Sequence, residues 1–253
     1  MAFRASKRLS ELTGYAFAEI DSKVAELKAG GIDVADFGVG DPTEPTPAVV
    51  REAIKRGVDA RATSGYPSYV GAGEFREAIA AWSRRRFGVT LDPATEISAS
   101  IGSKEAVFNF PEAVLDPGDF VLVPNPGYPP YSRGTRFAEG RVHYLNLLPE
   151  NGFLPDFDSI PSDVLKKARL LWINYPNNPT GACAPRSFYE RAVEFGRKYG
   201  IVVASDEAYT ENFYGDPPPS ILEFAREGVI AFQSLSKRSC MTGYRVGWVA
   251  GDR

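Results

Sequence analysis

Histidine and cysteine are scarce in this sequence, and their scarcity excludes several kinds of active site. Among 253 residues there are one histidine, His143, and two cysteines. Ser-His-Asp hydrolases and zinc proteases of the two-histidine type need histidine partners that the chain does not supply. Cys183 and Cys240 form no Cys-x-x-Cys pair, which indicates a reducing compartment and no metal site. We expect both cysteines to be small buried hydrophobic residues and His143 to be an ordinary strand residue.

Basic blocks and long apolar runs are also missing. The formal net charge is -3, the isoelectric point is near 5.4, and no basic block is longer than Arg84–Arg86, so nothing resembles an electrostatic footprint for nucleic acid. No run approaches the roughly 20 apolar residues that span a bilayer. The N-terminus lacks the continuous apolar segment of a secretory signal, and Glu11, Glu19 and Asp21 disfavour a transit peptide. We expect a cytoplasmic protein that binds neither nucleic acid nor membranes.

Short apolar runs alternate with helix-like segments along most of the chain. The runs are Glu96–Ile101, Phe120–Pro124, Val142–Leu147, Leu170–Asn174, Ile201–Asp206, Val229–Leu235 and Val246–Ala250. Seven candidate strands that alternate with helices predict an α/β domain with a largely parallel sheet covered on both faces. Helices are predicted over Ser10–Ala29, from an N-cap at Thr46 with Pro47 at the first position, and over Gly73–Phe87. In such sheets ligands collect beyond the carboxyl ends of the strands.

Small and polar residues follow three of the predicted strands. Gly102-Ser103-Lys104 opens a helix whose free N–H groups make an anion site, although this stretch taken alone favours an N-cap role for Ser103 over a phosphate site. Tyr128 lies in the rigid turn NPGYPPY, where it either stacks on a planar ligand or plugs the edge of the sheet. Asn178 lies in YPNNPTG, where prolines hold its amide in an extended stretch, although turn chemistry alone explains this composition.

Charged residues follow the next two strands. Asp206 ends an apolar run, where desolvation disfavours a carboxylate unless a cation lies beside it. A helix N-cap is the plain alternative, and an acid pair with Glu207, as in glycosidases, is weakened because adjacent strand residues diverge. Lys237 follows the next run among small residues, and Arg245 comes at the glycine-rich strand after it. A partly desolvated lysine near other cations serves as a nucleophilic amine.

An anion site, an aromatic stacker, an amide, a buried carboxylate, a phenol and a reactive lysine are together the groups that pyridoxal 5'-phosphate (PLP) requires. The strings NNPTG and SLSK, with an arginine eight positions after the lysine, resemble the class I and II aminotransferases of PLP fold type I over essentially the whole chain. The resemblance implies a three-layer α/β/α PLP-dependent transferase large domain with a mostly parallel seven-stranded sheet, preceded by an N-terminal arm. It also implies an enzyme that moves an amino group between an amino acid and a 2-oxo acid.

This resemblance gives a role to each candidate residue. Lys237 resembles the lysine that forms the Schiff base and shuttles a proton, and Asp206 resembles the partner of the pyridinium nitrogen. Asn178 and Tyr209 resemble the pair that hydrogen-bonds the 3-oxygen of the cofactor, and Tyr128 resembles the residue that stacks on its ring. The residues that resemble the phosphate cradle are Ser103, Lys104, Ser234, Ser236 and Arg245. The resemblance also implies contact of Tyr66 with the phosphate of the other subunit of a homodimer, and contact of Gly40 and Asn178 with the substrate.

Four strings, VGDPTEPTP, GSKEA, NPGYPPY and SLSKRS, look most similar to the LL-diaminopimelate aminotransferase-like branch. That branch implies LL-diaminopimelate, aspartate or alanine as the amino donor, a role in lysine biosynthesis, and Tyr15 as a substrate contact. It also implies residues 1–45 as the arm with part of a small domain, and residues 46–253 as the PLP-binding large domain. Family chains continue past this point into the rest of the small domain, with an arginine that clamps the substrate carboxylate. We expect the 253-residue chain to lack that part, to bind PLP weakly at best and to have negligible turnover alone.

Other interpretations compete with this one. Ser234 and Lys237 fit the Ser-x-x-Lys of penicillin-binding acyl-enzymes, but no Lys-Thr-Gly follows, and that motif should open a helix rather than continue a strand. Gly38 and Gly40 suggest a dinucleotide loop, but Thr43 stands where the third glycine belongs. A PLP-dependent lyase or decarboxylase stays open, because the cofactor residues do not fix which α-carbon bond breaks. A catalytically incompetent fragment that at most binds PLP also stays open.

Overall fold

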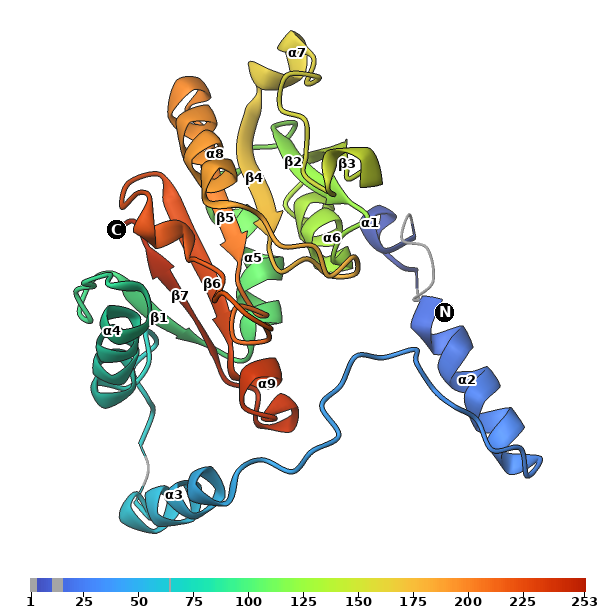
Figure 1. Cartoon of the computed structure of the whole chain (residues 1–253), viewed down its shortest axis with the longest axis vertical. Helices are drawn as coiled ribbons and strands as arrows, with labels where there is room; N and C mark the ends of the chain where they lie inside the picture. Colours follow the sequence, from blue (N-terminus) through green and yellow to red (C-terminus); the bar gives the residue numbers. More distant parts are fainter. Residues whose placement is uncertain (1–3, 11–15, 64) are drawn as a thin grey trace. The chain divides into compact units, whose positions relative to one another are not determined.

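The computed structural model describes residues 4–10, 16–63 and 65–253 (Figure 1). The chain divides into two compact units, residues 1–43 and 44–253. The first unit contains α1 (Lys7–Ser10) and α2 (Ala16–Ala29). The helix predicted over Ser10–Ala29 is confirmed from Ala16 to its end. Gly31 follows with a positive φ of 80°, a backbone conformation that glycine adopts without steric cost.

The second unit is built on a seven-stranded sheet in the order β1-β7-β6-β5-β4-β2-β3. Its strands are β1 (Ile97–Ser100), β2 (Phe120–Asn125), β3 (Arg141–Asn146), β4 (Ala168–Asn174), β5 (Val202–Asp206), β6 (Val229–Ser234) and β7 (Gly247–Gly251). Strands β6, β5, β4, β2 and β3 are parallel neighbours, and β7 runs antiparallel to both β6 and β1. All seven predicted strands and the mostly parallel sheet are confirmed.

Successive strand residues face two separate hydrophobic cores, because neighbouring side chains of a strand point to opposite faces. In β4, Leu171 lies in one core and Trp172 in the other. Two helices cover each face: α4 (Gly73–Phe87) and α8 (Arg186–Tyr199) one, α5 (Ser103–Val114) and α6 (Pro129–Phe137) the other. Figure 1 shows α8 and α5 on either side of the central strands. The three-layer α/β/α arrangement is therefore confirmed.

Glycines end both helices of one face. Gly88 follows α4 with a φ of 71°, and Gly200 follows α8 with a φ of 66°. Each donates its N–H to the carbonyl oxygen four residues earlier, which satisfies one of the free carbonyls of the last turn. The helix predicted over Gly73–Phe87 is confirmed at both ends. The short elements that remain are η1 (Pro149–Asn151), α7 (Ser162–Leu165), η2 (Ile221–Glu223), α9 (Leu235–Arg238) and η3 (Thr242–Tyr244).

The predicted start of α3 (Ala48–Ala60) is wrong by one residue. Pro47 is the N-cap and makes no side-chain cap, so it is not the first helical residue. Thr46 does not cap the helix either, because its hydroxyl donates to the carbonyl oxygen of Cys240. The Thr46 hydroxyl thus bonds to a residue that is distant in sequence instead of to the N-terminal N–H groups of α3.

The scarce residues are placed only partly as expected. His143 lies in β3, as predicted. The expectation of two buried cysteines is wrong: Cys183 is exposed, and Cys240 is half-buried with a φ of 50°. Cys183 belongs to the irregular stretch between β4 and α8, which lies at the surface, where no core covers it. Within the described ranges, no helix has both the length and the apolar character needed to cross a membrane.

Gly134 tests how closely α6 packs on α5. A Cβ atom at this position would lie against the carbonyl oxygen of Phe108, closer than real Cβ atoms approach. Because helix backbone cannot turn aside as a flexible side chain can, we expect Gly134→Ala to lower the free energy of unfolding by about 1–3 kcal/mol. Urea unfolding measures this change.

Gly57 supplies the matched control for that measurement. It lies in α3, and apart from its chain neighbours and the backbone of its own helix, no described atom comes within 4 Å of the added Cβ. Gly57→Ala should therefore raise the free energy of unfolding by about 0.5–1 kcal/mol, because alanine favours the helix. A free energy of unfolding that also rises in Gly134→Ala would contradict the close packing at Gly134.

Candidate active site

Most of the predicted site residues lie at one edge of the sheet. Asp206 is the last residue of β5, Ser234 is the last residue of β6, and Lys237 lies in α9 directly after it. Arg245 reaches the same edge because it precedes β7, which runs in the opposite direction. The other members of this edge are Ser103 and Lys104 after β1, Tyr128 after β2, Asn178 after β4, Tyr209 after β5 and Ser236 after β6.

The Asp206 carboxyl group is buried, with 4% of the residue exposed. The Tyr131 hydroxyl donates to its Oδ2 at 2.8 Å, and the Ala208 N–H donates to its Oδ1 at 3.3 Å. Burial raises the pKa of Asp206 to about 6, because the ionised form loses its hydration, and the two hydrogen bonds offset only part of that effect. Within the described part of the chain, no lysine or arginine forms an ion pair with it.

Tyr131 is a site residue that the sequence analysis missed. Its ring is fully buried and stacks on Trp172, with 4.8 Å between the ring centroids. Burial, and then the neighbouring Asp206 charge, raise the pKa of the Tyr131 phenol well above its usual value, so it remains a donor. The spacing Tyr-Pro-Pro-Tyr was the available signal, since it puts Tyr131 in the first turn of the helix that Tyr128 caps.

Asn174 is the second residue that was missed, and it connects two strand ends. Its Nδ2 donates to the backbone oxygen of Asp206 at 2.8 Å, and its Oδ1 accepts the N–H of Asn178 at 2.8 Å. The turn that carries Asn178 is thereby fixed relative to Asp206. The only signal in the sequence was an amide at the last position of an otherwise apolar strand.

Two further phenols lie beside Asp206 and its partner Tyr131, one next to each. Burial, and then the charge of Asp206, raise the pKa of the half-buried Tyr209. Tyr128 meets Tyr131 edge to face, with 5.7 Å between the ring centroids. Residues that follow β2 and β5 therefore converge on the same carboxylate, as parallel strand ends require.

The start of α5 lies beside the arginine that precedes β7. Gly102 precedes α5 with a φ of 73°, and a Cβ atom there would run into the Arg245 guanidinium group. Gly247, at the start of β7, packs closely against the start of α5, since a Cβ atom there would come 2.6 Å from the N atom of Ser103. Arg245 itself adopts a left-handed φ of 55° and donates to the Thr242 carbonyl oxygen at 2.8 Å. A guanidinium group beside a helix N-terminus suits a phosphate.

The prediction that β6 runs on to Leu235 is wrong. The strand ends at Ser234, whose Oγ accepts the N–H of Ser236 at 3.1 Å and caps α9. Lys237 is half-buried within this single helical turn. Since Ser-x-x-Lys does open a helix here, strand continuation no longer counts against an acyl-enzyme serine. The missing Lys-Thr-Gly still does.

Glu207 follows Asp206 but belongs to a different hydrogen-bond network. Its fully buried carboxyl group accepts hydrogen bonds from Ser220, Ile221 and Gln233. Burial raises the pKa of Glu207 to about 7, against the effect of these bonds. Asp206 and Glu207 share no hydrogen-bond partner, which disfavours a paired-acid glycosidase.

Nothing in the structure tests the other three predicted residues. Tyr66 lies between α3 and α4 and is fully exposed. Gly40 belongs to the first unit, and Tyr15 lies outside the described residues. These three positions remain predictions from the resemblance.

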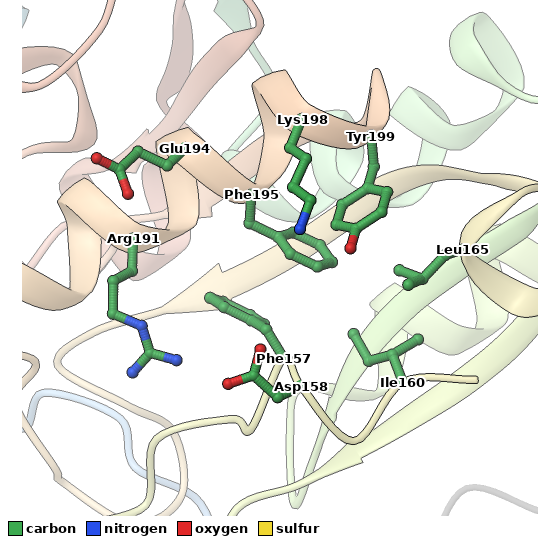
Figure 2. Close-up of a pocket in the computed structure, with 9 residues that line it drawn as sticks. All are labelled: Phe157, Asp158, Ile160, Leu165, Arg191, Glu194, Phe195, Lys198 and Tyr199. Atoms are coloured by element: carbon green, nitrogen blue, oxygen red, sulfur yellow. The ribbon is translucent and has the colours of Figure 1, made fainter. Parts of the chain in front are cut away.

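A cavity of about 250 Å³ lies elsewhere, between α8 and the stretch before β4. Figure 2 shows the rings of Phe157 and Phe195 facing one another there, with Arg191 and Lys198 around them. Because this wall includes the end of α8 that leads into β5, the cavity lies at the amino edge of the strands. It contains none of the predicted site residues. Over the described ranges, no group of three His, Cys, Asp or Glu residues could hold a metal ion.

Comparison with known proteins gives consistent matches. The profile of the family described as "Aminotransferase class I and II" matches residues 32–253. The chain is 49% identical over 254 residues to an LL-diaminopimelate aminotransferase of Aquifex aeolicus, and 48% identical over 255 residues to one of Syntrophobacter fumaroxidans. These matches cover 99% and 100% of the chain but 66% of each relative, so the chain spans just under two thirds of their length.

Solved structures give the same picture. Substrate-bound BacF from Bacillus subtilis has a TM-score of 0.94 at 35% identity, covering 99% of this chain and 64% of that one. The aspartate aminotransferase of Thermus thermophilus with maleate has a TM-score of 0.90 at 32% identity, covering 99% of this chain and 65% of that one.

Asp206→Asn isolates the cost of burying the Asp206 carboxylate. Its pKa rises from 3.8 to about 6 on folding, so between these values the folded state keeps a proton that the unfolded state has released. The stability that the neutral acid contributes is present below the lower value and is lost as the pH rises through the upper one. Between about pH 4 and about pH 7, we expect the free energy of unfolding of the cofactor-free wild type to fall by about 3 kcal/mol relative to that of Asp206→Asn. Urea unfolding across this range measures the difference, and a constant difference would contradict the burial cost.

Proposed function

Because this chain belongs to the class I and II aminotransferases, we propose that it binds PLP at the carboxyl edge of its sheet and moves an amino group between an amino acid and a 2-oxo acid. The observation that carries the proposal is the buried Asp206 carboxyl group, which has no described cation as a partner. A protonated ring nitrogen is the cation that such a site accepts, since it would offset the lost hydration of the carboxylate.

The residues at this edge fit the two ends of the cofactor. At one end, Asp206 receives the ring nitrogen. At the other, the start of α5 and Arg245 receive the phosphate, because the Arg245 guanidinium group packs against Gly102, directly before the first N–H groups of α5. Ser103, Lys104, Ser234 and Ser236 complete the phosphate cradle in this proposal. When bound, PLP supplies the carbonyl group that takes the amino group and the ring that accepts the electron pair from the α-carbon of the substrate.

Each chain residue then has a defined task. Lys237 provides the Nζ amine that attaches the cofactor, and afterwards carries a proton to and from the α-carbon of the substrate. Asp206 holds the proton on the ring nitrogen, and the hydrogen bond from Tyr131 keeps its Oδ2 in place. Asn178 and Tyr209 orient the ring through its 3-oxygen, and Tyr128 stacks on it. Asn174 keeps Asn178 in register with Asp206.

LL-diaminopimelate is the amino donor that we propose, with a role in lysine biosynthesis. Relatives that are 48–49% identical carry that activity in their names. Gly40, Asn178 and Tyr15 are assigned to the substrate, and residues 46–253 to the cofactor. We place the protein in the cytoplasm as a homodimer. The test is the full-length gene product assayed with LL-diaminopimelate, aspartate and alanine against 2-oxoglutarate, and no transfer from any of the three would reject the proposal.

Lys237 is expected to carry the cofactor covalently after reduction. Treating the PLP-loaded protein with borohydride should leave one pyridoxyl group on the peptide that contains Lys237, as found by mass spectrometry. Lys237→Ala should abolish this label. Lys104→Ala is the matched control, and should keep the label on Lys237 at a raised PLP concentration, because its role is in phosphate binding. A label on Lys104 would overturn the assignment.

Tyr66 is expected to serve the site of a partner subunit. Its side chain is fully exposed on its own chain, which leaves it available to another. Mixing full-length Lys237→Ala with full-length Tyr66→Phe should give heterodimers in which one site carries neither change, so transfer activity should exceed the sum of the two separate variants. Activity equal to that sum would contradict shared sites.

A further inference from the structure

Glu207 holds together three segments of the chain that are distant in sequence. Its Oε1 accepts the Ser220 hydroxyl at 3.1 Å and the Ile221 N–H at 2.8 Å. Its Oε2 accepts Nε2 of Gln233 at 2.8 Å. One carboxyl group, with no exposed surface, therefore joins the end of β5, the start of η2 and the end of β6.

The backbone of Glu207 anchors the turn that carries Tyr209. Its N–H donates to the carbonyl oxygen of Phe232 at 2.8 Å, which extends the pairing of β5 with β6. Its carbonyl oxygen accepts both the N–H and the hydroxyl of Thr210, at 3.2 Å and 3.0 Å. Tyr209 lies between these two attachment points, so its backbone position follows from that of Glu207.

Gln233, the residue of β6 that donates to Glu207, lies directly before the helical turn that carries Lys237. Gln233 is 3% exposed and immediately precedes Ser234, which caps α9. The Glu207–Gln233 hydrogen bond therefore fixes the last residues of β6 against the end of β5. Asp206 and Lys237 belong to these two strand ends.

We propose that Glu207 is a positioning residue, whose carboxyl group sets the ends of β5 and β6 relative to one another and so aligns Asp206 and Tyr209 with Lys237. This inference rests on the proposed function for its chemical consequence. The alignment itself is a property of the cofactor-free chain, and can be measured there.

The energetics favour a geometric role over a stabilising one. An acid without exposed surface pays a large desolvation cost, and apolar side chains of similar size are often as stable or more stable at such positions. The neighbours of Glu207 offer hydrogen bonds, and Tyr189, a phenol whose pKa the Glu207 charge helps to raise, is itself buried. A buried cluster in which both oxygens of one carboxyl group accept hydrogen bonds instead restricts the strand ends to one arrangement.

Glu207→Met tests the role, because it removes all three acceptor contacts at similar volume. We expect the dissociation constant for PLP to rise at least tenfold. Without cofactor, we expect amide hydrogen exchange to quicken at least tenfold over residues 208–212 and 235–239. Glu207→Gln should recover most of both properties, since its amide oxygen still accepts from Ser220 and Ile221 and its amide group can pair with Gln233.

Glu223→Met is the matched control on the same turn. Glu223 accepts the N–H of Ser220 and pairs with Arg186, and among the described residues its side chain makes no hydrogen bond or ion pair with β5 or β6. Glu223→Met should lower the free energy of unfolding. It should leave the PLP dissociation constant and the amide hydrogen exchange over residues 208–212 and 235–239 within twofold of wild type. Equal effects of Glu223→Met and Glu207→Met would reduce Glu207 to a structural role and overturn the proposal.

Gln233→Met decides the matter if Glu207→Met does not fold. This variant removes only the side-chain hydrogen bond between Gln233 and Glu207. It should raise the PLP dissociation constant and quicken amide hydrogen exchange over residues 235–239. Wild-type values for both would overturn the positioning role. If the wild type itself takes no PLP at Lys237, the proposed function fails, and the exchange data still decide whether Glu207 aligns the strand ends.

Discussion

A carboxyl group buried at the end of an apolar strand is the constraint on which the site depends. Asp206 can stay there only because other groups approach it: the Tyr131 hydroxyl, the Ala208 N–H and, in the proposed function, a cationic ring nitrogen. Tyr131 can approach only because α6 packs on the sheet so that its ring stacks on Trp172. The packing of one covering helix and the chemistry of the site are therefore one requirement.

The strands and most of the site were predictable, for a physical reason that applies to parallel sheets. A strand buried on both faces is a continuous apolar run, so β4 and β5 are visible without any alternation of polar residues. The polar residue that ends such a run must lie at the carboxyl edge, where ligands bind. Asp206 was found in this way, and its burial was expected from the run before it.

The residues that were missed act through contacts with no local signal. Tyr131 reaches Asp206 across 75 positions of sequence, and Thr46 reaches Cys240 across 194. Nothing in the residues next to Tyr131 or Thr46 records these partners, so Tyr131 passed as part of a turn and Thr46 as a helix cap. The end of β6 failed for a related reason: Leu235 is apolar enough to continue the strand, but the hydroxyl of Ser234 caps a helical turn instead.

The antiparallel β7 also sets the order in which the molecule can be assembled during synthesis. Strands β2 to β6 can pair with one another as they leave the ribosome, whereas β1 pairs only with β7, through contacts such as Ile97 with Ala250. Until β7 emerges, β6 presents an open edge to other chains, and pairing over so long a separation is slow. Gly102 and Arg245 lie on either side of the same late closure. The corner of the sheet where we propose that phosphate binds is thus the last to form, and it stays incomplete until β7 has been synthesised.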